Sequence, residues 1–315
     1  MSGVGQTWRS LVGQWLTAFG RVFLFVALFL ALLLGGGLLL QVADRGASFL
    51  LQSVVTAIAA FVAGAILIRR LEHRPAGALG LAWTSTTLRE LALGLAIGLG
   101  ALACAVAFML LGGGLRYTGQ PGSAAAWFTV VATGFGTLAI AAFEEEVLFR
   151  GYPFQVLVQA IGGVAATLLA SAIFALAHAP NPNVDLFALV NIFLAGILLS
   201  VAYLRTRSLW FATAVHLGWN WGMALLFDLP VSGLEVFDAP LYEPAVGGPR
   251  WFTGGAFGPE GGIVGSLAFA IALFAVLMTP GLSVAPEMAA LRPLGLEGRT
   301  EVESWNGSRK SKVES

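Results

Sequence analysis

The sequence predicts an all-α polytopic membrane protein with about eight transmembrane helices. Hydrophobic residues make up 57% of the 315 residues, while charged residues make up only 11%. Soluble domains carry about 25% charged residues, so this composition excludes an ordinary soluble fold. The apolar residues also form long uncharged runs, and a run of about 20 residues crosses ~30 Å of hydrocarbon at ~1.5 Å per residue.

The first three runs form an N-terminal region, residues 1–126. A mixed stretch with Trp8, Arg9 and Trp15 is expected to lie at the membrane surface before the first span. That span, residues 22–40, exceeds the apolar core of a signal peptide and has no convincing small-x-small cleavage site, which favours a retained anchor. The other two spans of this region are residues 49–68 and 91–111.

Four further spans form a core region, residues 127–227, and one span follows it. The fourth span begins at Trp127, and the later ones cover residues 164–179, 186–204, 209–227 and 262–278. Between the last two, residues 228–261 are rich in Gly, Pro and aromatic residues and are expected to form an extracytoplasmic loop over the mouth of the bundle. Residues 279–315 are expected to be a flexible cytoplasmic tail.

The basic residues predict the orientation, because cytoplasmic loops carry the excess of Lys and Arg. With eight spans, most of the 17 Lys and Arg residues lie on the same side as both termini, which are therefore predicted to be cytoplasmic. The exceptions are Arg45, Arg116 and Arg250.

The formal net charge of zero does not indicate a nucleic-acid partner, and the single cysteine, Cys104, excludes an intramolecular disulfide.

Three consecutive carboxylates, Glu144, Glu145 and Glu146, lie between two of the apolar runs. A charge at the centre of a bilayer costs at least about 2.5 kcal/mol, so ionisable residues at this depth indicate a functional site. Glu146 and Arg150 share one face of a helix and can pair, whereas Glu145 is about 100° further round and can face a cavity. Glu144 is expected to face water. The alternative is a solvated carboxylate cluster at a helix end.

Two of the three histidines lie inside predicted spans. Phe174 and His178 are four residues apart in the fifth span, and His216 and Asn220 repeat this spacing in the seventh. Each residue alone has a structural interpretation, since buried His forms hydrogen bonds and Asn can hold helices together. Their occurrence beside an embedded Glu pair favours one wet pocket formed by the fourth, fifth and seventh helices.

The three motifs are Glu145-Glu146-x-x-x-Arg150, Phe174-x-x-x-His178 and His216-x-x-x-Asn220. In this order and with these gaps they resemble the CAAX-processing and bacteriocin-processing (CPBP, Abi) family of intramembrane proteases, to which the type II CAAX prenyl endopeptidases are related. The resemblance covers roughly residues 127–227, and Gly151 follows the motif arginine as is usual in the family.

This resemblance implies an endopeptidase that hydrolyses a peptide bond at the membrane. Glu145 would activate water, His178 would bind or orient that water, and His216 and Asn220 would donate to the oxyanion, with Glu146, Arg150 and Phe174 in support. The rival assignment makes His178, His216 and Glu145 ligands of a catalytic Zn²⁺. We slightly favour the metal-independent version, because Asn is an uncommon zinc ligand, but the sequence leaves both open.

A substrate like that of the prenyl endopeptidases would be a lipidated or membrane-bound peptide cut near its C-terminus. The cavity of this cell-membrane protein is expected to open to the cytoplasm. Two other classes stay open: a proton-coupled transporter, because buried Glu, Arg and His also make proton relays, and a non-catalytic membrane partner in bacteriocin immunity or scaffolding. The motifs His-Glu-x-x-His, Gly-x-Ser-Gly and Gly-x-Gly-Asp of other membrane proteases are absent.

Counting residues along straight spans does not place all the site residues at the same depth in the membrane. His216 is expected ~10 Å inside its span, and Glu145 matches this depth only if its helix continues past Arg150 to about residue 158. His178, in contrast, is expected near the far end of the fifth span. Strong tilt, a late helix start or a deep water-filled cavity would have to close this gap.

Overall fold

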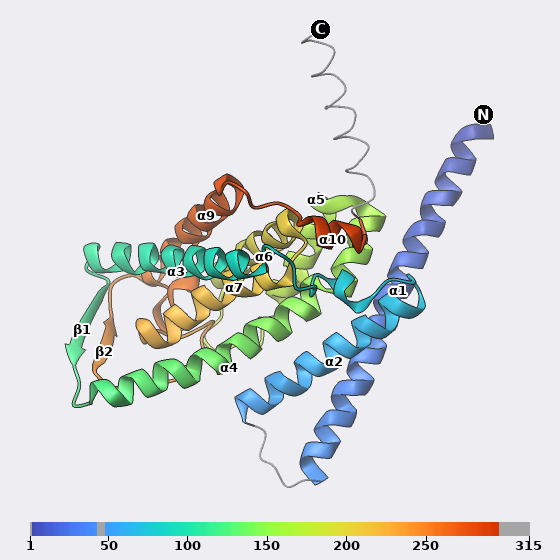
Figure 1. Cartoon of the computed structure of the whole chain (residues 1–315). Helices are drawn as coiled ribbons and strands as arrows, with labels where there is room; N and C mark the ends of the chain where they lie inside the picture. The colour runs from blue at the N-terminus through green and yellow to red at the C-terminus, as the bar shows by residue number, and fades with distance from the viewer. Residues whose placement is uncertain (1, 43–47, 296–315) are drawn as a thin grey trace.

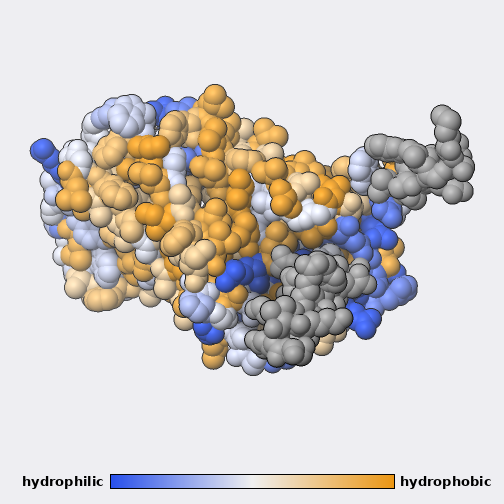
Figure 2. Space-filling view, turned by 90° about the horizontal axis from the view of Figure 1, so that it is seen from above, coloured by the Kyte–Doolittle hydropathy of each residue, from blue (hydrophilic) through white to orange (hydrophobic). Residues whose placement is uncertain are grey.

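The computed structural model describes residues 2–42 and 48–295, and most of its regular structure is helical (Figure 1). Five stretches of these residues are long and apolar enough to cross a membrane, one of them the 54-residue stretch Ala124–Ala177. Large apolar side chains such as Phe23, Val164 and Phe274 are exposed, and Figure 2 shows a broad apolar surface. The chain is therefore a multi-pass, all-α membrane protein, whereas the count of eight spans and the orientation of the termini stay predictions.

The N-terminal helices are longer than the apolar runs that predict them. Helix α1 covers Ser2–Val42 without a break, so the expected surface stretch is part of the same helix as the first span. Helix α2, Phe49–Arg70, begins where the Ser48 hydroxyl accepts the N–H of Leu51. After the short helix η1, Ala76–Leu79, helix α3 covers Thr87–Leu111.

The glutamate helix, α4, covers Ala124–Arg150, so it does not continue to residue 158 as an equal depth of Glu145 and His216 would require. The chain turns at Gly151, where a β-carbon would lie 2.2 Å from the carbonyl oxygen of Val147. Helix α5, Tyr152–Ala177, then begins in a new direction and bends at Gly162, which has a φ of 80°. Because of this break and this bend, the depth of His178 cannot be obtained by counting along a straight span.

Helix α6, Leu186–Thr206, is followed by α7, Leu209–Trp221, which carries the His216 motif. The predicted seventh span is divided, because residues Gly222–Leu226 form one π-helical turn, η2, instead of continuing the α-helix. Helix α7 packs very closely on α3: a β-carbon at Gly98 would lie only 2.0 Å from the carbonyl oxygen of Val215. Small residues permit this backbone contact, as at many helix interfaces in membranes.

A small antiparallel sheet joins two distant parts of the chain at one end of the bundle (Figure 1). Strand β1, Leu115–Gly119, pairs with β2, Tyr242–Val246, so that Leu115 lies opposite Val246. The all-α prediction did not include this sheet. The remaining short elements between η2 and the last long helix are α8 (Arg250–Thr253), η3 (Gly255–Phe257) and η4 (Pro259–Gly261).

Helix α9, Ile263–Met278, follows this connecting segment, and the chain then returns across the bundle to a short helix α10, Pro286–Ala290. The described part of the predicted flexible tail is packed. Leu294 is fully buried, and the Arg207 guanidinium donates to the carbonyl oxygens of Leu294 (3.1 Å) and Gly295 (3.0 Å). Residues 296–315 of that prediction lie outside the described residues.

Candidate active site

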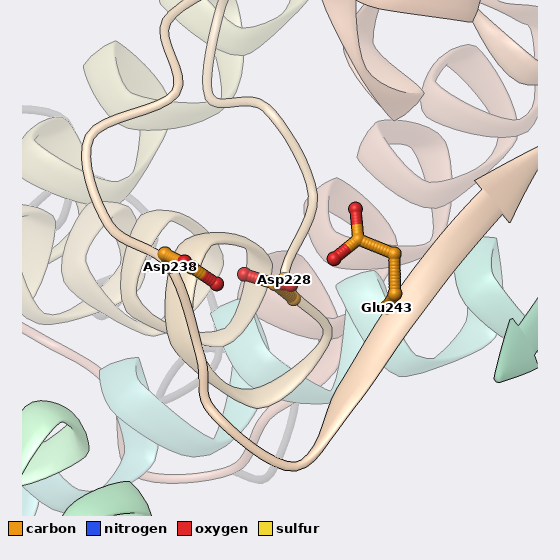
Figure 3. A group of neighbouring side chains, drawn as sticks. All are labelled: Asp228, Asp238 and Glu243. Atoms are coloured by element: carbon orange, nitrogen blue, oxygen red, sulfur yellow. The ribbon is translucent and has the colours of Figure 1, made fainter. Parts of the chain in front are cut away.

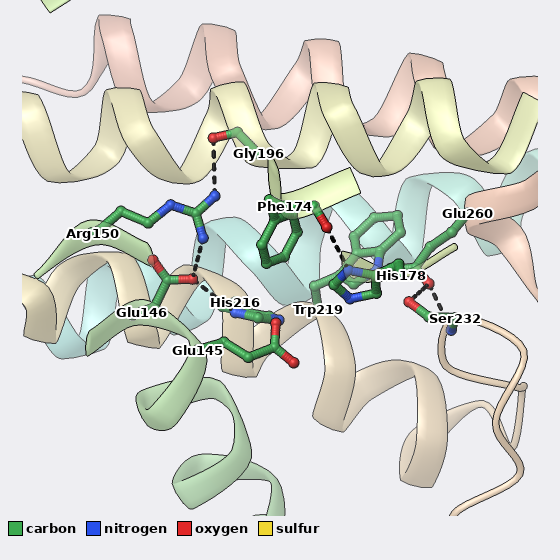
Figure 4. Close-up of polar contacts among 10 residues, drawn as sticks. All are labelled: Glu145, Glu146, Arg150, Phe174, His178, Gly196, His216, Trp219, Ser232 and Glu260. Atoms are coloured by element: carbon green, nitrogen blue, oxygen red, sulfur yellow. Dashed lines mark hydrogen bonds and ion pairs between the residues drawn. The ribbon is translucent and has the colours of Figure 1, made fainter. Parts of the chain in front are cut away.

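Helix α4 supplies a fully buried ion pair at its C-terminal end. Arg150 donates to Glu146 Oε1 at 3.0 Å, and neither side chain has exposed surface. The guanidinium also donates to the Gly196 carbonyl oxygen of α6 at 3.1 Å and lies 4.5 Å from the centroid of the Phe174 ring. The pair that the four-residue spacing predicts is therefore present, and it connects α4 to α5 and α6 (Figure 4).

The His216 ring of α7 lies between the two motif glutamates. Its Nδ1 is 2.9 Å from Glu146 Oε1, and its Nε2 is 3.9 Å from Glu145 Oε2. Glu146 is paired with Arg150 as a carboxylate, so it accepts and His216 Nδ1 carries the donated proton. The Nε2 atom of His216 is thereby left to face Glu145 (Figure 4).

Glu145 is the more available carboxylate of the pair. Its side chain is 30% exposed, whereas that of Glu146 is completely buried. Within the described chain no hydrogen bond reaches the buried atom Glu145 Oε2. Glu144 points elsewhere: its carboxylate contacts Ser53 of α2 and is half-buried, so it does not simply face water as expected.

His178 lies directly after the end of α5 and turns back over the last turn of that helix. Its Nδ1 is 2.8 Å from the carbonyl oxygen of Phe174. A carbonyl only accepts, so Nδ1 carries the proton and the neutral ring keeps Nε2 as a free acceptor. The Phe174 ring separates the two histidines, with its centroid 4.6 Å from that of His178 and 6.4 Å from that of His216.

Residues of all three motifs line one cavity of about 330 Å³, and the wall of this cavity is mainly apolar. Its lining includes the motif residues Glu145, Phe174, His178, His216 and Asn220. Glu146 and Arg150 are buried behind His216 rather than in the lining. The tertiary structure thus brings the three motifs together, although they come from helices that are separated along the chain.

Sequence reasoning missed three polar residues of this cavity: Asn181, which follows α5, and Ser232 and Glu260 of the segment 228–262. The Glu260 carboxylate is buried and accepts the indole N–H of Trp219 at 2.9 Å and both the N–H and the hydroxyl of Ser232 at 2.7 Å. Burial raises the pKa of the Glu260 carboxyl. The sequence did carry one signal for Glu260, because it is a single acid in a Gly-rich stretch directly before an apolar helix.

The donor atoms of His178, His216 and Glu145 do not all lie within 4.8 Å of one another, although His216 Nε2 is 3.9 Å from Glu145 Oε2. Among the described residues, only Asp228, Asp238 and Glu243 place three such atoms within 4.8 Å of one another. These acids line a different cavity (Figure 3). Burial raises the pKa of Asp228 to about 6, an effect that the Ala239 N–H only partly offsets. Zinc binding by His178, His216 and Glu145 therefore stays a prediction.

Residues 123–222 match the family model described as "Type II CAAX prenyl endopeptidase Rce1-like". The matched region contains α4 to α7 and hence all three motifs. A comparison with curated proteins finds no relative that matches the chain. The family match confirms the resemblance to the CAAX protease family that the motifs indicate.

Proposed function

We propose that this member of the CAAX protease family is an intramembrane endopeptidase in which Glu145 activates the attacking water. The observation that supports this proposal is the meeting of Glu145, His178, His216 and Asn220 in one largely apolar cavity. Of the two motif glutamates, only Glu145 lines that cavity, because Glu146 is engaged by Arg150 and His216. A general base must be able to reach a bound water, and Glu145 meets this requirement.

The proposed reaction begins when Glu145 takes one proton from a water molecule, whose oxygen attacks the carbonyl carbon of the scissile bond. His178 accepts a hydrogen bond from this water at Nε2, which its contact with the Phe174 carbonyl leaves free. The tetrahedral intermediate collapses as the C–N bond breaks, and the protonated Glu145 returns its proton to the leaving amine.

His216 and Asn220 are proposed to donate to the oxyanion. His216 can donate from Nε2 only when both ring nitrogens carry protons, because Nδ1–H is committed to Glu146. The Glu146 and Glu145 carboxylates lie 2.9 Å and 3.9 Å from Nδ1 and Nε2 of this ring. Each oxyanion donor in comparable sites lowers the barrier by about 3–4 kcal/mol.

We further propose that the substrate is a membrane-associated peptide, lipidated near its C-terminus, that enters from the cytoplasmic side. The mainly apolar cavity wall supports a substrate with an apolar portion. The mechanism is proposed to be metal-independent, since the three candidate zinc ligands do not form a ready set. Were zinc bound, it would supply a Lewis acid and lower the pKa of a coordinated water.

The decisive experiment uses the purified protein with a quenched fluorescent peptide, with and without a farnesyl group. Glu145→Gln, His178→Ala and His216→Ala are each expected to lower kcat by about 10²- to 10⁴-fold. Glu235→Gln, which removes an exposed carboxylate, is the control and is expected to match the wild type. A chelator is expected to have no effect, and inhibition reversed by Zn²⁺ would overturn the metal-independent mechanism. Undiminished cleavage by Glu145→Gln would overturn the assignment of the base.

A further inference from the structure

Glu260 is a buried carboxylate near the catalytic residues that belongs to none of the three motifs. It is 4% exposed, and it comes from the short helix η4, which directly precedes α9. A carboxylate is rarely buried unless its hydrogen bonds are satisfied, because an unpaired buried charge is costly. Here Oε1 accepts from Trp219 Nε1, and Oε2 accepts from the N–H and hydroxyl of Ser232 (Figure 4).

The donors to Glu260 connect it to both catalytic histidines. Trp219 lies on α7 between His216 and Asn220, so the indole contact holds the helix that carries the proposed oxyanion donors. On the other side, Asn181 Nδ2 donates to the Ser232 carbonyl oxygen at 3.0 Å, and the Asn181 N–H donates to the His178 carbonyl oxygen at 3.0 Å. A chain of hydrogen bonds therefore runs from the His178 backbone through Asn181, Ser232 and Glu260 to Trp219 of α7.

The backbone around Glu260 is itself anchored. Asn191 of α6 donates from Nδ2 to the carbonyl oxygens of Glu260 (2.7 Å) and Gly262 (2.8 Å), and its Oδ1 accepts the Ser266 hydroxyl at 2.6 Å. Asn191 is completely buried. Because α6 and α9 hold the backbone in this way, the carboxylate is a fixed point rather than part of a loose connecting loop.

The convergence of three donors requires a carboxylate at this position. Glutamine has one acceptor oxygen, and its amide group would place N–H bonds against the donors of either Trp219 or Ser232. Hydrogen bonds to a carboxylate are stronger than those between neutral groups, so Trp219 and Ser232 are held firmly.

We propose that Glu260 is a positioning residue, which sets the separation between His178 and the His216–Asn220 helix across the cavity. This inference rests on the proposed peptidase function. A shift of about 1 Å between reacting groups can cost about 100-fold in rate. Loss of the Glu260 contacts should therefore slow the chemical step much more than it weakens substrate binding.

The test compares Glu260→Gln with Glu235→Gln, which removes an exposed carboxylate from the same connecting segment. Glu260→Gln is expected to lower kcat by about 10- to 100-fold with KM changed less than about twofold, while Glu235→Gln changes neither. Trp219→Phe removes one donor and is expected to lower kcat as well. The double variant should lose less than the product of the single effects, because both changes break the same hydrogen bond.

Three outcomes separate this inference from the proposed function. If the wild type cleaves the peptide and Glu260→Gln keeps its kcat, the positioning role is overturned and the peptidase stands. If Glu260→Gln does not fold, Trp219→Phe replaces it in the test, and it too is expected to lower kcat with little change in KM. If the wild type cleaves no peptide, the proposed function fails. Hydrogen exchange of residues 228–240 then tests the anchoring: faster exchange in Glu260→Gln than in Glu235→Gln supports it, and equal exchange overturns it.

Discussion

At the residue scale, one oxygen atom organises the centre of the site. Glu146 Oε1 accepts from both Arg150, at 3.0 Å, and His216 Nδ1, at 2.9 Å, so it joins α4 to α7. A buried ion pair contributes little net stability compared with a well-packed apolar pair, because both charges lose their hydration. Its importance here is geometric, since it sets the orientation of His216 relative to Glu145.

Replacing Arg150 with Met should therefore be much more harmful than replacing both partners. Arg150→Met leaves the Glu146 carboxylate buried without its cation, which costs about 3–5 kcal/mol and should lower the midpoint of thermal unfolding in detergent. The double variant Glu146→Gln/Arg150→Met should recover part of this loss but not the peptidase activity.

The control for this prediction is Arg250→Met. Arg250 forms an ion pair with Asp185 in which both side chains are well exposed (48% and 37%), and such surface pairs contribute about 0–1 kcal/mol. An Arg150→Met variant as stable as Arg250→Met would contradict the role given to the buried pair.

At the scale of elements, helix α7 is held by contacts on two sides. It packs on α3 through direct backbone contact at Gly98, and it packs on α4 where Glu146 binds His216. The residue whose carbonyl touches Gly98 is Val215, which directly precedes His216. Any change in the spacing of α3 and α7 should consequently be transmitted to the His216 ring.

Two alanine substitutions on the same helix test this dependence. Gly98→Ala would place a β-carbon 2.0 Å from the Val215 carbonyl oxygen, whereas a β-carbon at Gly100 has no neighbour within 4 Å. We expect Gly98→Ala to lower the thermal midpoint, since overpacking costs about 1–3 kcal/mol, and to reduce kcat. Gly100→Ala should be neutral or slightly stabilising because of its better helix propensity. Equal behaviour of the two variants in unfolding and peptidase assays would refute this account of α7.

At the scale of the whole molecule, the bundle holds the cavity and the segment 228–262 forms part of its wall. Val231, Ser232 and Glu260 of that segment all line the cavity, so these residues pack on the bundle. At the other end, the residues after α9 are held by Arg207 and by Gln155, whose Oε1 accepts the Leu294 N–H at 3.1 Å. The side of the membrane on which each end lies follows only from the distribution of basic residues.

Cysteine labelling tests this orientation directly. In a Cys104→Ala background, Gly247→Cys and Ala289→Cys are both exposed and lie at the two ends that are predicted to face opposite compartments. A membrane-impermeant maleimide applied to intact cells should label Gly247→Cys and should label Ala289→Cys only after permeabilisation. The reverse pattern would invert the topology, and it would place the connecting segment 228–262 in the cytoplasm.

The prediction of the fold was most successful where hydrophobicity alone decides the outcome. Helices α2, α3 and α6 begin and end within a few residues of their apolar runs, because a long uncharged stretch can satisfy its backbone in lipid only as a helix. The break at Gly151 and the π-helical turn after Trp221 were not predicted. The break at Gly151 nevertheless has a local cause, because Pro153 lies in the first turn of α5 and has no N–H with which to continue the hydrogen bonding of α4.

The sequence by itself determined the membrane class, the three motifs and the pairing of Glu146 with Arg150, because these depend on composition and on spacing within one helix. Only the tertiary structure decided that Glu145 and His216 face each other, that His178 shares their cavity, and that Glu260 connects the two sides of it. The physical reason is that these contacts join side chains far apart in the chain. Their distances are set by helix packing and by the turns between helices, which no local pattern specifies.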